Sequence, residues 1–245
     1  MKGEVLSGVP LPSMVLPRLA RWAAQESVAF DACTSPFKAR FVEGDERVLL
    51  IVGANASGKS LVFRMIAQMA DADGIEALTL SIRERSASGP YEMARMRRSM
   101  IFGDEETSST GAISARVVES GFSNLSSRGN AILGFDEPEI GLSDGYAEAL
   151  GEYIAICVKG MHGNACGVML VTHSRRLAEG LVRGLGRDPA MLSMGEAPND
   201  VGEWIKSREE RSVEELLGLR TVALERFRTV NRLLGRGRKE EVSDG

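Results

Sequence analysis

The sequence predicts an α/β fold, in which a mostly parallel β-sheet is flanked by helices, and two observations predict this class. Short, uniformly apolar segments, of the kind that form buried parallel strands, recur along the chain. Amphipathic segments with helical spacing alternate with them, and strand–helix alternation is typical of layered α/β domains. The chain has 245 residues, of which 43% are hydrophobic, so it is long enough for one large domain with a substantial core.

The strand and helix candidates follow one another in this alternating order. The expected strands are 28–30, 38–42, 48–52, 77–82, 99–102, 131–135, 168–171 and 191–194. Helices are expected over 61–69, 146–157, 177–185 and 213–234, and we expect the apolar stripe of each to face the core. The stripe of the second of these helices begins at Tyr146, and that of the last contains Val213, Leu216, Leu217, Leu224, Phe227 and Leu234.

Residues 53–60 read GANASGKS and form a complete G-x-x-x-x-G-K-[ST] motif between the apolar strand and the first of these helices. That strand–loop–helix context is the one in which the motif binds phosphates. The backbone N–H groups of such a loop wrap a phosphate chain, and the helix N-terminus adds partial positive charge. Lys59 would reach the β- and γ-phosphates, and the Ser60 hydroxyl would bind Mg²⁺. We call residues 53–60 the phosphate-loop motif.

Two further strands end in residues that suit the same chemistry. In AILGFDEPEIGLS (131–143), the strand ends in Asp136, which can hold Mg²⁺, followed by Glu137, which can deprotonate a water aimed at the γ-phosphate. In VMLVTHS (168–174), the strand ends in Thr172 and His173, and a histidine there can bond the γ-phosphate and position that water. The sequence therefore predicts a nucleotide site with Lys59, Glu137 and His173 as catalytic residues.

These three segments together resemble the ATP-binding cassette (ABC) ATPases. The 53–60 motif resembles the family's Walker A motif, FDEPEIGLS its Walker B strand with the catalytic glutamate and D-loop, and VTHS its switch histidine. The resemblance implies a signature motif that caps the nucleotide of the opposing subunit, and the candidate is Ser109 with Gly111. It implies ATP and Mg²⁺ as cofactors, with Ser60 and Asp136 at the metal. The nucleotide would be held by Gly53, Asn55, Ala56, Ser57, Gly58, Lys59, Ser60, Leu61, Ser109 and Gly111.

The departures from the family pattern favour its non-transporter branch, which includes the ATPase domains of overcoming-lysogenization-defect and DNA-repair ATPases. Only 77 residues (136 − 59) separate Lys59 from Asp136, which leaves room for a reduced helical subdomain within about 83–128. DEPEIGLS has Glu139 after the proline, where transporters usually have Thr or Ser. The family's glutamine is missing, and Glu84 is a weak substitute. Phe30 and Phe37 could each stack on adenine or belong to the core.

We therefore expect three parts: an N-terminal extension (1–26), helical over 18–25, that packs on the domain or meets a partner; an ABC-type ATPase domain (27–234); and a polar, disordered tail (235–245). The chain has no membrane-length apolar run and no C-x-x-C pair among its three cysteines, which we interpret as reduced core thiols of a cytoplasmic protein. Its net charge of −4 excludes a strongly basic nucleic-acid binder.

The partners implied are a second copy of the chain in a head-to-tail homodimer with ATP at the interface, and a second protein subunit that carries the output activity. Nucleic-acid contact stays open, because 83–98 contains several arginines that also suit a solvated helix face. Three alternatives stay open too: the ATPase subunit of an ABC transporter, a small-molecule P-loop kinase, and a nucleotide sensor without turnover. A kinase needs neither Glu137 nor His173, and phosphate transfer to a metabolite would reveal it.

Overall fold

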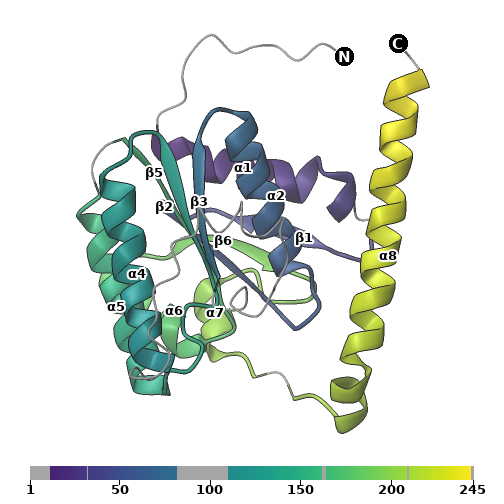
Figure 1. Cartoon of the computed structure of the whole chain (residues 1–245). Coiled ribbons are helices and arrows are strands. Elements are labelled where there is room, and N and C mark those ends of the chain that lie inside the picture. The colour runs from purple at the N-terminus through teal and green to yellow at the C-terminus, as the bar shows by residue number, and fades with distance from the viewer. Residues whose placement is uncertain (1–11, 32, 82–109, 162–163, 209, 244–245) are drawn as a thin grey trace.

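Most of the described residues are arranged around one β-sheet. The computed structural model describes residues 12–31, 33–81, 110–161, 164–208 and 210–243. These form a six-stranded sheet in the order β1-β6-β2-β5-β4-β3 (Figure 1). All neighbouring strands are parallel except β1 and β6, which are antiparallel, so the α/β class with a mostly parallel sheet is confirmed. The strands are β1 (Ala39–Val42), β2 (Asp45–Gly53), β3 (Glu76–Ser81), β4 (Ala131–Asp136), β5 (Ala165–Val171) and β6 (Pro189–Met194).

Helices cover both faces of the sheet, which is why its central strands contain continuous apolar runs, such as residues 48–52 of β2. Successive residues of β2 point to opposite faces: Leu49 and Ile51 belong to one core cluster, and Val48, Leu50 and Val52 to the other. The first cluster includes α1 (Val15–Gln25) and α2 (Lys59–Ala72). The second includes α4 (Thr110–Ser126), α5 (Asp144–Lys159), α6 (Arg175–Leu185) and α7 (Val201–Lys206).

The first of these helices, α1, lies in the segment 1–26, which we expected to be an extension that packs on the domain or meets a partner. α1 begins at Val15, earlier than the predicted 18, after a short 3₁₀ turn, η1 (Pro12–Met14). Leu16 is fully buried, and a Cβ added to Gly167 of β5 would come within 2.6 Å of its Cδ1. The helix therefore packs in the core of the domain. Residues 1–11 lie outside the described chain.

Two strand predictions need comment. Residues 28–30 form a 3₁₀ turn, η2 (Val28–Phe30), so the predicted strand there is wrong. The Ser27 hydroxyl accepts a hydrogen bond from the Ala29 N–H at 3.3 Å, the local side-chain bond that favours turns over strands. The predicted strand 99–102 lies outside the described residues. Of the segment 83–128 assigned to a reduced helical subdomain, the described part forms α4 and the turn before β4.

α5 and α6 are held together by unusually close backbone contact, which fixes the position of the segment before α6. A Cβ at Gly151 of α5 would lie 2.0 Å from the Leu177 carbonyl oxygen, and one at Gly180 of α6 would lie 2.0 Å from that of Glu148. Any side chain at either glycine would push the helices apart. The predicted stripe of α5 is correct at Leu150 and Ile154, but Tyr146 is 71% exposed.

The last helix, α8 (Val213–Ser243), extends further than predicted, and its stripe differs from expectation. The helix continues over 235–243, part of the segment 235–245 for which we expect a disordered tail. Its apolar stripe is exposed instead of facing the core, with Leu217 77% and Phe227 58% accessible. α8 lies beside the sheet and follows a connecting segment after α7 (Figure 1).

All three cysteines carry free thiols, and Cys33 is exposed, contrary to the prediction of core thiols.

Candidate functional site

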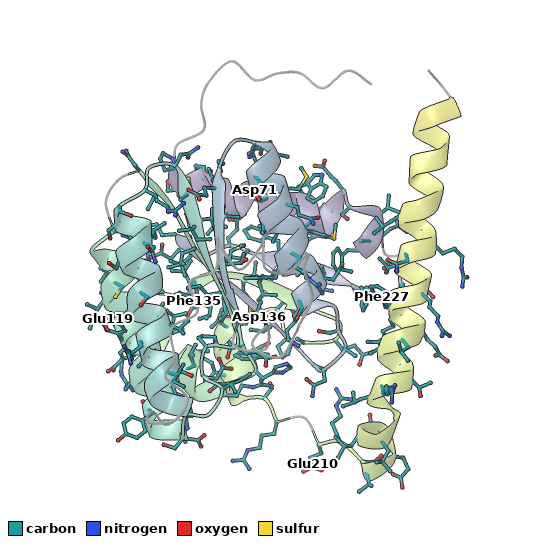
Figure 2. The ribbon with its side chains drawn as sticks, in the orientation of Figure 1. Asp71, Glu119, Phe135, Asp136, Glu210 and Phe227 are labelled. Carbon is teal, nitrogen blue, oxygen red and sulfur yellow. The ribbon has the colours of Figure 1, made fainter. Side chains whose placement is uncertain are left out.

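Three parallel strands bring the predicted site residues to one edge of the sheet. β5 lies between β2 and β4, with Ile51 level with Val171 and Val171 level with Asp136. Backbone bonds continue this alignment past the strand ends, because Glu137 N–H donates to the Val171 carbonyl at 2.9 Å and Thr172 N–H to the Ile51 carbonyl at 3.3 Å. The segments 53–60, 136–137 and 172–173, far apart in the sequence, therefore meet at the carboxyl ends of adjacent strands. Figure 2 shows Asp136 at this end of the sheet.

The phosphate-loop motif connects β2 to α2 and has the left-handed backbone that its sequence allows. Gly53, Ala56 and Gly58 all have positive φ, at 146°, 59° and 97°. A Cβ at Gly53 would lie 2.6 Å from the Met194 carbonyl oxygen, so only glycine fits there. At Gly58 a Cβ would meet the Phe37 ring at 2.9 Å. This compact turn leads directly into the first N–H groups of α2, which have no intrahelical acceptor.

Lys59 is folded back into this loop. Its ammonium group donates to the carbonyl oxygens of Gly53 at 2.9 Å and Ala54 at 2.7 Å, and the residue is 5% exposed. The buried Ser57 hydroxyl makes no hydrogen bond within the described residues. A cation and a hydroxyl donor are thus held inside a loop that is closed by left-handed turns. Asn55 is exposed at its tip, and Ser60 and Leu61 lie in the first turn of α2.

Glu137 and His173 form the second half of the arrangement. The His173 Nε2 atom lies 3.3 Å from the Glu137 carboxylate, and Glu137 and Asp136 are both buried, at 5% and 8% exposed. Glu137 has φ of 54°, a left-handed conformation that is strained for a residue with a side chain. The structure thus brings together the acid, the following glutamate and the histidine predicted from separate segments.

Glu139 belongs to the same group, although sequence reasoning gave it no role. One of its carboxylate oxygens accepts bonds from the Thr172 hydroxyl at 2.5 Å and from the His173 N–H at 3.3 Å. Burial raises the pKa of Glu139 above its ordinary value, and the nearby Glu137 carboxylate adds to the rise. Glu139 therefore fixes the backbone that carries His173. Its position after Pro138 in Asp-Glu-Pro-Glu was the only sequence signal that could have found it.

Two arginines that were not predicted from the sequence donate hydrogen bonds to groups around the site. Arg175 donates to the His173 carbonyl at 3.4 Å and to the Ser207 hydroxyl at 3.3 Å, and its guanidinium lies 3.9 Å from the centre of the buried Trp204 ring. Arg226 of α8 donates to the Ala56 carbonyl of the phosphate-loop motif at 2.8 Å. No local pattern reveals such contacts, since Arg226 and Ala56 are 170 residues apart.

The other predicted residues have different outcomes. Ser109 and Glu84 lie outside the described residues, and Gly111 lies in the first turn of α4, so the signature assignment stays a prediction. Phe30 and Phe37 are both buried core residues, with ring centres 6.2 Å apart. The structure thus favours the core interpretation of both aromatics.

The residues present fit a nucleotide with its magnesium ion. A nest of backbone N–H groups, the Lys59 cation and the buried Ser57 hydroxyl suit a phosphate chain. Over the described residues, no three His, Cys, Asp or Glu side chains cluster as they would for a protein-only metal site. Magnesium usually needs only one or two protein ligands besides phosphate oxygens and water, so Ser60 and Asp136 would suffice.

Comparisons of the chain with family models, curated proteins and solved structures found no match. Among the described helices, none has the length and apolar character needed to cross a membrane.

Proposed function

We propose that this chain binds ATP·Mg²⁺ and hydrolyses ATP, as an ABC-type ATPase of the non-transporter branch. The observation that carries the proposal is the Glu137–His173 pair, 3.3 Å apart, beside a strand that leads into a phosphate-loop motif. A buried carboxylate next to a histidine is equipped to take a proton from an attacking water. A small-molecule kinase would need neither residue in this place.

Each residue has a role that follows from its position. Lys59, released from the carbonyls of Gly53 and Ala54, would bond the terminal phosphates instead and neutralise their charge. Ser60 and Asp136 would hold Mg²⁺, which supplies further charge neutralisation. Glu137 would orient and deprotonate the water, and His173 would bond the γ-phosphate and hold Glu137 in place.

The proposed assembly is a head-to-tail dimer with ATP between the subunits. One subunit supplies the phosphate-loop motif, and the other supplies Ser109 and Gly111. ATP hydrolysis would open this dimer, and a second protein subunit would use that motion. The setting, DNA repair or anti-phage defence in the cytoplasm, rests on the family resemblance.

The test is the variant Glu137→Gln, with Glu139→Gln as its matched control. Both changes replace a carboxylate by an amide at nearly equal volume, two residues apart. Glu137→Gln should lose the general base, so that phosphate release falls roughly a hundred- to ten-thousandfold while ATP still binds. Glu139→Gln keeps an oxygen that accepts from Thr172 and His173, and it should retain turnover within a few-fold.

The measurements are steady-state phosphate release and equilibrium ATP binding, together with sizing chromatography in ATP·Mg²⁺. Glu137→Gln should accumulate as an ATP-bound dimer. Wild-type turnover in Glu137→Gln would remove the role given to that residue. Transfer of the γ-phosphate to a metabolite instead of to water would replace the ATPase by the kinase alternative.

A further inference from the structure

The apolar stripe of α8 is a separate feature that the nucleotide site does not explain. Its side chains are large and solvent-exposed, and they lie on one face of the helix. A different face of α8 meets the body, where Val230 is 2% exposed within the core cluster and Arg226 bonds Ala56. Figure 2 shows Phe227 on this helix, apart from the sheet. An apolar face of this length marks a contact surface. The exposed residues are Val213, Leu216, Leu217, Leu224, Phe227 and Leu234.

The spacing along the stripe indicates that another helix covers it. Positions alternate by four and three residues over three heptads, which is the period of a left-handed two-helix seam. Five of these seven positions are apolar, and Arg220 and Asn231 occupy the other two. A sheet edge or a membrane surface would not require this strict 3.5-residue period. The seven positions are 213, 217, 220, 224, 227, 231 and 234.

The charges on α8 select both the partner and its direction. Residues 210–219 carry three glutamates and one arginine, a net charge of −2, whereas 220–234 carry four arginines and one glutamate, a net charge of +3. Two copies of α8 packed antiparallel place the acidic half of each along the basic half of the other. In a parallel pair, by contrast, Arg220 would face Arg220 of the second copy in the middle of the seam, and like charges there are unfavourable.

We infer that α8 is a homodimerisation helix, which packs antiparallel on α8 of a second copy of this chain through the part of the stripe from Val213 to Asn231. In an antiparallel pair, residues of the two copies whose numbers have the same sum lie opposite each other. Leu217 therefore packs against Phe227, Leu224 against Arg220, and Val213 against Asn231. Leu224 packs against the aliphatic part of Arg220, whose guanidinium extends to solvent. Glu214 lies alongside Arg228 of the other copy. The contact is twofold symmetric and therefore closed.

This dimer forms without nucleotide, so it is distinct from the proposed ATP-dependent one. Nothing in the seam belongs to the nucleotide site, and the stripe is exposed in the structure, which contains no nucleotide. The two are connected through Arg226, which ties the same helix to the phosphate-loop motif. Pairing of α8 would therefore keep two ATPase sites on one particle even when the ATP-dependent interface opens.

The first experiment measures the mass of the full chain by light scattering, without nucleotide, up to roughly 100 µM. Wild type should have the mass of two chains. The double variant Leu217→Glu with Phe227→Glu should raise the dissociation constant roughly a hundredfold or more, because it places charges in the centre of the seam. Tyr146→Glu makes the same kind of change at an exposed site on α5 and should leave the dimer intact. Circular dichroism checks that each variant is folded.

The second experiment fixes the direction by cross-linking in a Cys33→Ser background. Leu217→Cys and Phe227→Cys chains, mixed and treated with a short bis-maleimide, should cross-link to each other, and neither variant should cross-link to itself. A nucleotide-binding variant, Lys59→Ala, should keep the dimer, which separates this inference from the ATPase proposal. A monomeric wild type, a dimer that survives both glutamates, or self-cross-linking of either cysteine variant would each overturn the antiparallel α8 dimer.

Discussion

The carboxyl end of the sheet and helix α8 both have regular apolar patterns, yet they use them in opposite ways. At the sheet edge, apolar strands are buried on both faces and deliver polar residues, such as Asp136 and Glu137, into a shielded site. On α8 the apolar residues themselves are exposed, and the contact with the body includes a charged residue, Arg226. A periodic pattern thus shows that a face requires cover, but it does not say which molecule supplies that cover.

The physical difference lies in how far away the covering groups are. A central parallel strand is enclosed by its neighbouring strands and by the helices on both faces of the sheet, so its burial follows from its place in the sheet. A terminal helix can bury its apolar face only if a complementary surface is within reach. On α8, Val230 is buried in the core cluster, whereas the stripe is exposed.

The largest effect is expected for Lys59→Ala, at the carboxyl end of the sheet. The loop then loses the cation that is held by the carbonyls of Gly53 and Ala54, and we expect kcat/KM for ATP to fall roughly a hundred- to a thousandfold. The fold should persist, because Lys59 contributes little to the apolar core. Phosphate-release kinetics measure kcat/KM, calorimetry measures ATP affinity, and thermal unfolding measures stability. Unchanged ATP affinity would mean that the loop does not bind phosphates.

The contrast between buried and exposed leucines gives the next largest effect. Leu16→Ala in α1 removes a fully buried side chain and should lower the free energy of unfolding by about 2–5 kcal/mol. Leu217→Ala on α8, studied at a dilution where the chain is monomeric, should change it by about 0.5 kcal/mol or less. Urea unfolding compares them. A small loss for Leu16→Ala would mean that α1 contributes little to the stability of the core.

Sequence reasoning worked where the information was local. The order of strand, glycine loop and helix is written in 48–69, and it predicted β2, the motif and α2. The polar residues after the strands at 131–135 and 168–171 predicted the meeting of Glu137 with His173, because the carboxyl ends of parallel strands share one edge.

The wrong predictions concern residues whose structure depends on tertiary contacts. Val28 and Phe30 were predicted to be strand residues but lie in a 3₁₀ turn, and the helix predicted over 18–25 begins at Val15 and packs in the core. Glu139 needed the strand register before its bonds to Thr172 and His173 could be seen. The exposure of the α8 stripe could be predicted only if it was known that the side of the helix with Val230 packs against the core.

The bonds of Glu139 lead to a pH prediction. The pKa of Glu139 is raised in the folded protein, chiefly by burial, so folding favours its protonated form. The stability this confers is complete below its ordinary pKa of 4.5 and is lost as the pH rises through the raised folded value. Glu139→Gln imitates the protonated form and should remove this part of the pH dependence, so its stability relative to wild type should grow with pH.

The measurement is the free energy of unfolding in urea at a series of pH values, from below 4.5 upward through the raised pKa of Glu139. The matched variant is Glu119→Gln, since Glu119 is exposed on α4 and its substitution should leave the wild-type pH profile unchanged. Parallel profiles for wild type and Glu139→Gln would contradict burial as the cause of the raised pKa.

The smallest effect is expected at the hydrogen bond that joins α8 to the phosphate-loop motif. Arg226→Ala removes a hydrogen bond to the Ala56 carbonyl, in a loop whose left-handed backbone at Ala56 must be held in place. A single bond of this kind contributes about 1 kcal/mol, so ATP affinity should weaken by less than about tenfold. Arg228→Ala, an exposed arginine two residues further along α8, should leave ATP affinity unchanged. Calorimetric titration with ATP·Mg²⁺ compares the two variants. If both variants bind ATP like wild type, α8 is independent of the loop, and its pairing cannot influence the nucleotide site through this arginine.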